Sequence, residues 1–271
     1  MVPRLLETPE TERAERRAAA AKSRAPLAAM TAVFVALPVF NEAAVVARVV
    51  DEVARFAAEH PEYRFLFVDD GSTDGTPDVV ASRIRDLGVP SLDLYRMRSN
   101  GGKGEAVHAA FALAKADVVL FTDGDLAYSL DHLPRLVDAL RSADVAIGSR
   151  SLCETNNERT APLRRVMGWT FNRLARVIVG LPYRDTQAGL KGFRAPAAEA
   201  IFRRRRLTGF AFDVELLAIA RRRGLRIAEI PASPSLEHAS QPSNVRMLRD
   251  PARMFAALLA VRLHRALGRY D

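Results

Sequence analysis

The feature that most constrains this chain is a regular alternation, from residue 31 onward, of short apolar runs with segments of helical spacing. The expected strands are 33–37, 65–68, 92–94, 118–121 and 145–147, and the expected helices between them are 43–58, 77–86, 104–114 and 133–140. Strands that alternate with helices form βαβ units and a parallel sheet. Because the apolar runs are nearly continuous, we expect helices on both sheet faces. The predicted class is α/β, with a Rossmann-like, mostly parallel sheet flanked by helices.

After Arg150 the alternation becomes less regular. We expect a helix over 165–179, a glycine-punctuated segment at 185–193, a helix carrying the arginine run 203–206, a helix near 212–222, a strand at 225–230, and a final helix from 250. This divides the chain into an N-terminal arm, 1–30, a single domain, 31–240, and a C-terminal amphipathic helix, 241–271. The domain itself has a first half, 31–150, and a second half, 151–240.

Composition excludes several classes of protein. Hydrophobic residues make up 49% and charged residues 27% of the 271 positions, which is typical of globular domains. The single cysteine, Cys153, excludes an intramolecular disulfide and a multi-cysteine metal site. No apolar run reaches the roughly 20 residues that span a bilayer, and residues 9–24 lack the apolar core of a signal peptide. We expect a cytoplasmic protein that can touch the inner face of the membrane.

Polar clusters follow every one of the first five expected strands. Ligands of open α/β sheets bind outside the carboxyl ends of the strands, so these clusters are expected to form the rim of one crevice. They cover residues 38–42, 69–75, 100–104, 123–125 and 148–150.

Asp123 and Asp125 are the strongest candidates for metal ligands. They follow the expected strand 118–121 two residues apart, which the pleat would turn to one side. Hard oxygen ligands without His or Cys favour Mg²⁺ or Mn²⁺, completed by substrate phosphates. The plainer interpretation is a pair of solvated loop carboxylates, and the other polar strand ends argue against it.

Two further loops have open interpretations. The segment 69–75 is either a strand-to-helix turn or a site where Asp70 holds a ribose or base; Ala81 excludes a calcium loop, which needs an acidic residue there. The segment 100–105, with glycines and Lys103 before a helix, is either a plain helix-start loop or a loop whose amides bind an anion. Glu105 stands where a Walker A loop needs Ser or Thr, so that loop is excluded.

Taken in order, these motifs resemble a known family. Segments 35–42, 68–75 and 123–125 are similar to those of family 2 inverting glycosyltransferases of the GT-A fold. Segments 100–107, 147–150, 184–193 and 212–217 resemble the dolichyl or polyprenyl-phosphate glucosyltransferase branch, to which dolichyl-phosphate mannose synthases are related. The resemblance covers about residues 31–250 and implies a single GT-A domain.

The resemblance also implies site residues. The nucleotide-sugar pocket would be lined by Pro38, Asn41, Glu42 and Asp70. The divalent metal on the donor diphosphate would be held by Asp123 and Asp125. The donor phosphate or the acceptor would be surrounded by Lys103, Arg150, Gln187 and Lys191. The transferred sugar would face Asp185, Asp213 and Glu215, of which Asp185 and Asp213 are the candidate catalytic residues and Glu215 is also a candidate on the acceptor side.

The implied function is metal-dependent, inverting transfer of a hexose to a polyprenyl phosphate. Glucose from UDP-glucose is the first choice and mannose from GDP-mannose the second. A hydroxyl acceptor would need Asp185 or Asp213 as general base, whereas a lipid phosphate is already anionic. Two departures from the family pattern concern the acceptor: His108 replaces an arginine, and Pro242-Ser243-Asn244 replaces a Gly-Ser-Lys.

Other classes stay as alternatives. A soluble hydroxyl acceptor is one, and a non-catalytic nucleotide-sugar-binding module is another. A phosphatase with a nucleophilic aspartate would place its Asp pair at the first strand, with Thr or Val at Ala127. The net charge of +8 fits a phosphate-bearing acceptor and an anionic membrane better than nucleic acid, which would not explain the strand-end carboxylates. The oligomeric state is left open.

The C-terminal helix has two interpretations. Met254, Leu258, Val261 and Arg265 recur at roughly helical spacing. This stripe either lies in a membrane interface, where flanking arginines would favour it, or packs onto the domain. We expect Trp169 in the core and the arginine run 203–206 on a solvated helix face.

Overall fold

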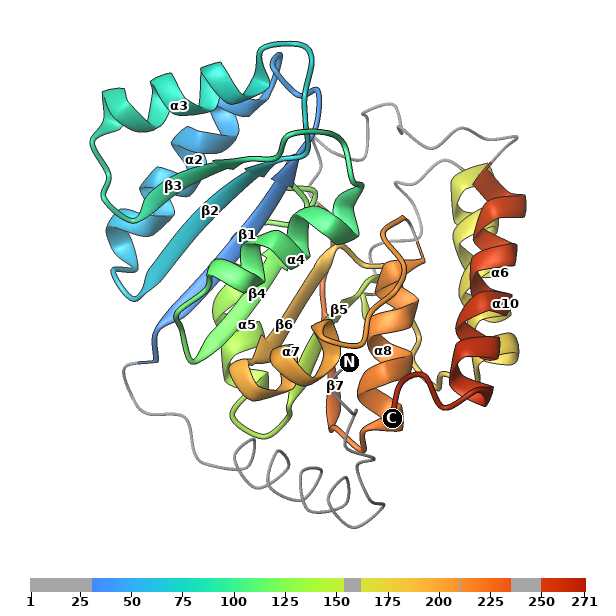
Figure 1. Cartoon of the computed structure of the whole chain (residues 1–271). Helices are drawn as coiled ribbons and strands as arrows, with labels where there is room; N and C mark the ends of the chain where they lie inside the picture. The colour runs from blue at the N-terminus through green and yellow to red at the C-terminus, as the bar shows by residue number, and fades with distance from the viewer. Residues whose placement is uncertain (1–30, 154–161, 210, 235–249) are drawn as a thin grey trace, which may run out of the picture.

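A seven-stranded sheet in the order β3-β2-β1-β4-β6-β5-β7 runs through the computed structural model, which describes residues 31–153, 162–209, 211–234 and 250–271 (Figure 1). Its strands are β1 Val33–Val39, β2 Tyr63–Asp69, β3 Leu92–Arg96, β4 Val118–Thr122, β5 Val145–Ser149, β6 Leu190–Arg194 and β7 Ile227–Pro231. The six strands expected from the sequence are all present. The mostly parallel α/β sheet is therefore confirmed.

Strand β6 was not expected. The segment 185–193 was described only as glycine-punctuated, but its second half pairs antiparallel with both β4 and β5. Gly192 explains why the signal is weak: a Cβ at this position would lie 2.5 Å from Leu120 Cδ2 of the neighbouring strand, so a larger residue would force the buried Leu120 side chain to shift. A lysine beside that glycine, Lys191, further hides the strand in the sequence.

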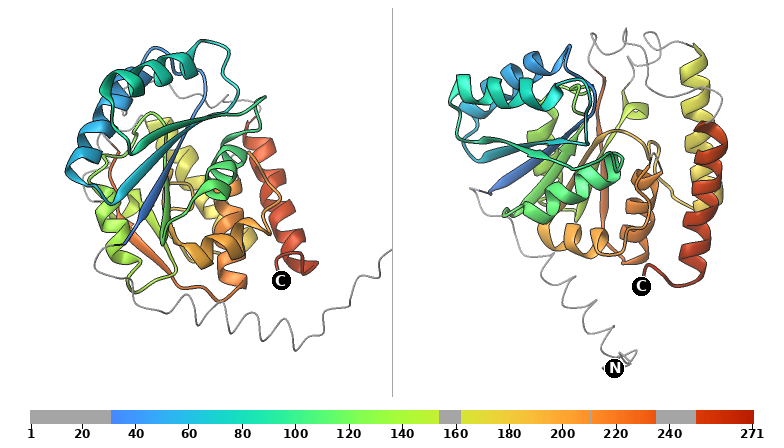
Figure 2. Two further views of the ribbon diagram at one scale, coloured as in Figure 1. Left: turned by 60° about the vertical axis from the view of Figure 1, so that its left-hand side comes forward. Right: turned by 45° about the horizontal axis from the view of Figure 1, so that its top comes forward.

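Helices cover both faces of the sheet (Figure 2). One apolar core lies under α2 Val46–Glu59, α3 Thr76–Leu87 and α5 His132–Ala139. The other lies under α4 Lys103–Leu113, α7 Ala195–Phe202 and α8 Phe212–Arg222. Outside α8 stand α6 Pro162–Val179 and α10 Asp250–Ala266 side by side, and η1 Arg150–Leu152 follows β5.

The pleat of β1 shows why the apolar runs are continuous. Val35 and Leu37 point into the first core, whereas Ala36 between them points into the second. Since both faces are buried, no position alternates to solvent along the strand. Pro38 is tolerated because the pairing of β1 with β4 ends at Ala36, so its missing N–H costs no bond on that side.

Some expected boundaries change. Helix α7 ends at Phe202, so the expectation that its face carries the arginine run 203–206 was wrong. Arg205 is not solvated either: its side chain is 7% exposed and pairs with Glu105. The arm 1–30, residues 242–244 and the side chain of Trp169 lie outside the described residues. Within the described part of the chain, no helix has the length and hydropathy needed to cross a bilayer.

The topology fixes where a ligand binds. From β1 the strand order runs one way through β2 and β3 and the other way through β4, so the order reverses between β1 and β4. Open α/β sheets form their binding crevice at such a switch point, beyond the carboxyl ends of the strands. The segments after Val39 and after Thr122 border this crevice.

Candidate active site

An ion pair between Lys103 and Asp123 lies at this switch point. Asp123 directly follows β4, and Lys103 is the first residue of α4; Lys103 Nζ is 2.5 Å from Asp123 Oδ1, and each side chain is 30% exposed. The ammonium also lies 5.4 Å from the ring centroid of Phe121 and 5.9 Å from that of Phe212. Burial opposes the charge on Lys103, but Asp123 and the neighbouring carboxylates outweigh it and raise its pKa.

Two glycines let the backbone close around Asp123. A Cβ on Gly189 would lie 1.9 Å from Asp123 Oδ2, and a Cβ on Gly124 would lie 2.2 Å from the carbonyl oxygen of Pro38. The ends of β1 and β4 and the turn before β6 therefore meet here. Asp125 Oδ1 accepts a hydrogen bond from the amide of Ala127 at 3.1 Å, in a turn rather than in the pleat expected from the sequence.

The donor set fits a divalent ion that is shared with a substrate. Asp123 and Asp125 supply hard oxygens, but among the described residues no group of three or more His, Cys, Asp or Glu side chains could hold an ion. Mg²⁺ typically takes one or two carboxylates and completes its shell with water and phosphate oxygens. Two carboxylates next to a crevice therefore suit an ion that arrives with a diphosphate.

The two loops expected to meet the nucleotide are bound to each other. Asn41 has φ +54°, its amide donates to Ser72 Oγ at 2.9 Å, and its Oδ1 accepts from the Thr73 amide at 2.9 Å. The amide of Glu42 donates to Thr76 Oγ1 at 2.8 Å. The loops after β1 and β2 thus form one wall of the crevice, and their contact with a nucleotide stays a prediction.

Asp70 binds the backbone amides that one interpretation of segment 100–105 assigned to a bound anion. Its carboxylate accepts hydrogen bonds from the amides of Gly101 at 2.7 Å and Gly102 at 2.9 Å. Burial raises the pKa of Asp70, and the two amides counter part of that rise. At this helix start the bound anion is the protein's own carboxylate, which fixes the turn that carries Lys103.

Lys191 does not face the crevice as the resemblance implied. Its side chain is fully buried, and Nζ donates to Asp213 Oδ1 at 2.7 Å and to the carbonyl oxygen of Ala188 at 2.6 Å. Burial lowers the pKa of Lys191 and raises that of Asp213, while the attraction between the two opposes both changes. Asp213 also influences the pKa of Lys103. Lys191 therefore holds Asp213 in place rather than a substrate.

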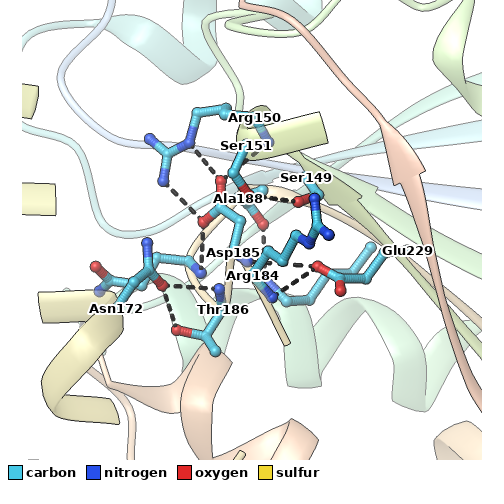
Figure 3. Close-up of polar contacts among 11 residues, drawn as sticks. Ser149, Arg150, Ser151, Asn172, Arg184, Asp185, Thr186, Ala188 and Glu229 are labelled. Carbon is cyan, nitrogen blue, oxygen red and sulfur yellow. Dashed lines mark hydrogen bonds and ion pairs between the residues drawn. The ribbon is translucent and has the colours of Figure 1, made fainter. Parts of the chain in front are cut away.

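Arg150 and Asp185 form a second pair (Figure 3). Arg150 Nε donates to Asp185 Oδ2 at 2.6 Å and Nη2 to Oδ1 at 2.9 Å. Although burial alone would raise it, the Arg150 guanidinium lowers the pKa of Asp185 to about 2. A carboxylate with such a pKa accepts a proton poorly, so the geometry favours a positioning role over that of a base. Gln187 lies beside the pair, its amide donating to Asp185 Oδ1 at 3.2 Å.

Glu215 belongs to the core and not to the crevice. It is fully buried on α8, and its Oε2 accepts from the amides of Arg206 at 2.9 Å and Leu207 at 2.8 Å. Its Oε1 accepts from the hydroxyl of Tyr270 at 2.8 Å. The placement beside an acceptor was wrong, because a side chain with no exposed surface cannot contact one.

Sequence reasoning missed residues that complete the site. Gly189 admits Asp123, as described above, and the carbonyl oxygen of Thr208 accepts from the amide of Gly104 at 2.9 Å, next to Lys103. Tyr128 is buried, and burial raises its pKa, while the charges of Arg150, Asp185, Asp123 and Asp213 act on it more weakly. The glycine in Ala188-Gly189-Leu190 was a visible signal; Thr208 and Tyr128 had none.

His108 lies away from the crevice. It stacks on Phe202 with ring centroids 6.2 Å apart, and its Nδ1 lies 2.7 Å from Arg205 Nη2. Burial, followed by the charge of Arg205, lowers the pKa of His108. His108 stands where the family carries an arginine, and in this chain the guanidinium of Arg205, from another segment, lies beside it.

Comparison with known proteins places the chain in a family. The Glycosyl transferase family 2 model matches residues 34–204. A dolichyl-phosphate beta-glucosyltransferase from Trichomonas vaginalis is 30% identical over 208 residues, which cover 72% of this chain and 61% of that protein. An undecaprenyl-phosphate mannosyltransferase from Micrococcus luteus is 33% identical over 175 residues, 63% of this chain and 71% of that protein.

Solved structures support the same fold. Glucosyl-3-phosphoglycerate synthase from Mycobacterium tuberculosis, in complex with Mn²⁺, UDP and glucosyl-3-phosphoglycerate, superposes with a TM-score of 0.61 at 20% identity. The superposition covers 98% of this chain and 86% of that one. The mostly parallel sheet, its switch point and the polar strand ends therefore agree with the match over residues 34–204, and the chain belongs to glycosyl transferase family 2.

Proposed function

We propose that this chain transfers a hexose from a nucleotide-sugar to a polyprenyl phosphate, with inversion and with Mg²⁺ or Mn²⁺. UDP-glucose is the first donor proposed and GDP-mannose the second. The names of the two relatives, a dolichyl-phosphate glucosyltransferase and an undecaprenyl-phosphate mannosyltransferase, support the acceptor and both sugars. The chain spans 61% of the length of the first of these relatives, so the activity of that whole protein is carried over here as a proposal.

The observation that carries the proposal is the position of Lys103, Asp123 and Asp125 at the switch point. Negative charge grows on the leaving diphosphate as the bond to the sugar breaks. A divalent ion bound by the two aspartates would act as a Lewis acid there, worth several kcal/mol. The ammonium of Lys103 would add positive charge beside the leaving diphosphate.

Arg150 is the residue best placed for an acceptor phosphate. Its side chain is 41% exposed although its partner Asp185 is only 3% exposed, so the guanidinium reaches from a buried anchor toward solvent. Arginines oriented in this way bind phosphate through charge-assisted hydrogen bonds. A phosphate monoester has a second pKa near ~6 and is an anionic nucleophile at neutral pH. Such an acceptor needs a positioning cation more than a base.

One observation favours a hydroxyl acceptor as the second candidate. Burial raises the pKa of Asp213, which makes its carboxylate a better proton acceptor than that of Asp185. A soluble hydroxyl acceptor would use Asp213 as general base. Family membership removes the phosphatase alternative, since the Asp123 segment lies within the matched region 34–204.

Helix α10 supports contact with the inner face of a membrane. The stripe singled out in the sequence packs onto the domain: Leu258 and Val261 are fully buried, and Arg265 Nη1 donates to the carbonyl oxygen of Val179 at 2.6 Å. The side chain of Met254 lies outside the described residues. A different set, spaced four residues apart, is exposed: Phe255, Leu259 and Leu263 on the helix and Leu267 directly after it. An apolar stripe beside arginines suits an anionic lipid interface.

The test is a grid of donors and acceptors. Purified protein is incubated with labelled UDP-glucose, GDP-mannose or UDP-N-acetylglucosamine, with Mg²⁺, Mn²⁺ or EDTA, and with polyprenyl phosphate or soluble sugars. We expect a glucosylated lipid phosphate that disappears with EDTA. Label found only in a soluble acceptor would overturn the lipid acceptor. Transfer that EDTA does not reduce would overturn the metal, and binding of UDP or GDP without any transfer would favour a non-catalytic module.

A further inference from the structure

Lys103 is paired with the carboxylate that would hold a metal ion. Its Nζ lies 2.5 Å from Asp123 Oδ1, on the same carboxylate that the proposed function assigns to Mg²⁺ or Mn²⁺. Two cations repel strongly at such separations in a partly buried site. The ammonium and a divalent ion therefore compete for this oxygen.

The pair is held in place from several sides. The ammonium lies over the rings of Phe121 and Phe212, which favours a cation there. The carboxylate is enclosed by the backbone at Gly189, where even a Cβ would collide with it. Each side chain is 30% exposed, so the pair borders the crevice and an incoming ligand can reach it. In the absence of a ligand, Lys103 is the cation that satisfies Asp123.

The turn around Lys103 has little else to offer an incoming phosphate. The amides of Gly101 and Gly102 are engaged by Asp70, and that of Gly104 by the carbonyl oxygen of Thr208. Of the groups described in this turn, the ammonium of Lys103 is the one whose charge would attract a diphosphate. An anion that attracts the ammonium also draws it away from Asp123.

We propose that Lys103 is a placeholder cation that keeps Asp123 closed to divalent ions until the donor diphosphate draws the ammonium away. The proposal rests on the proposed function, because the anion it invokes is the diphosphate of the nucleotide-sugar. Binding of metal and of nucleotide are then coupled through one lysine. Such coupling is reciprocal: each ligand tightens the other by the same factor.

The test measures Mn²⁺ binding directly, by titration calorimetry and by the electron paramagnetic resonance of free Mn²⁺. For the wild type we expect weak Mn²⁺ binding alone and at least about tenfold tighter binding with saturating UDP or GDP. Lys103→Met removes the competing cation, so it should bind Mn²⁺ alone about tenfold more tightly than the wild type and bind the nucleotide more weakly. Lys115→Met, at an exposed lysine outside the site, is the matched control and should behave as wild type.

The outcomes are separable from those of the proposed function. If Lys103→Met binds Mn²⁺ alone no more tightly than the wild type, the placeholder is refuted even though nucleotide and metal bind. If neither UDP nor GDP binds the wild type, the nucleotide-sugar function itself fails. Asp123→Asn should abolish Mn²⁺ binding with and without nucleotide, and binding that survives it would place the ion elsewhere.

A measurement on the wild type guards against a variant that fails to fold. The chain has four lysines, so their ¹⁵Nζ signals can be assigned. We expect the Lys103 signal to stay unchanged with Mg²⁺ alone and to shift when UDP or GDP is added with Mg²⁺. A Lys103 signal that shifts fully with Mg²⁺ alone would contradict the proposal.

Discussion

Replacing Asp185 by asparagine tests whether this carboxylate works as an anchor for Arg150. The folded protein holds the pKa of Asp185 at about 2, against 3.8 for a free side chain. Each pKa unit corresponds to about 1.4 kcal/mol, so the ionised carboxylate contributes about 2.5 kcal/mol of stability at neutral pH. Asp185→Asn keeps the shape, loses the charge, and should lower the free energy of unfolding at pH 7 by about 2 kcal/mol.

The pH dependence gives the sharper readout. A depressed pKa stabilises the folded state above the unfolded pKa, and that contribution is lost as pH falls through the folded value. The difference between wild type and Asp185→Asn should therefore be full at pH 7, about half at pH 3, and nearly absent below pH 2. Urea unfolding at several pH values measures it. Asp138→Asn, at an exposed aspartate of α5, is the control and should change stability by less than about 0.5 kcal/mol throughout.

A constant difference from pH 7 to pH 3 would refute the reasoning, since it would mean that the charge of Asp185 is not what stabilises the pair. The same variant also distinguishes a positioning role of Asp185 from a role as general base. If Asp185 only positions Arg150, Asp185→Asn should slow transfer but leave the acidic limb of the pH–rate profile where it was. Loss of that limb would return Asp185 to the role of general base.

Three further predictions concern other parts of the chain. Tyr270→Phe leaves a buried oxygen of Glu215 without its hydrogen-bond donor, and should lower the free energy of unfolding, measured in urea, by about 1–3 kcal/mol. An unchanged urea midpoint would contradict this hydrogen bond. Gly189→Ala forces a Cβ against Asp123 and should weaken Mn²⁺ binding in the presence of UDP about tenfold or more, whereas Gly209→Ala, which meets nothing within 4 Å, should not. Leu263→Ser should reduce co-sedimentation of the protein with anionic vesicles and leave its melting temperature unchanged. If the variant and the wild type sediment equally, α10 does not bind the membrane.

Much of the fold could be predicted because it depends on local pattern. Apolar runs predicted five strands and the segment 225–230 a sixth, and the polar residues after the first five predicted the crevice. Strand β6 escaped because Gly192 and Lys191 interrupt its apolar character, and both residues are explained only by partners elsewhere: Leu120 on β4 and Asp213 on α8. No local pattern shows that a lysine will be buried against an aspartate 22 residues away.

The identities of the polar residues could be predicted better than their roles. Lys191 and Glu215 were singled out for substrates, yet the structure uses them on the protein itself, for Asp213 and for the loop at Arg206. Asp70 also binds the turn that carries Lys103, and its contact with a nucleotide stays a prediction. A motif shows which residue types a site needs. Whether a given side chain faces the ligand or supports a neighbour depends on burial, which tertiary packing decides.

The most direct test of the central claim is the rate of hexose transfer when Asp123 alone is changed. Asp123→Asn keeps the side-chain volume and removes the charge that pairs with Lys103 and would hold the ion. With labelled donor, polyprenyl phosphate and Mn²⁺ we predict a rate at least about a hundredfold below that of the wild type, and an Asp138→Asn control at the wild-type rate. Equal rates for Asp123→Asn and the wild type would contradict a site built on Asp123 at the junction of β1 and β4.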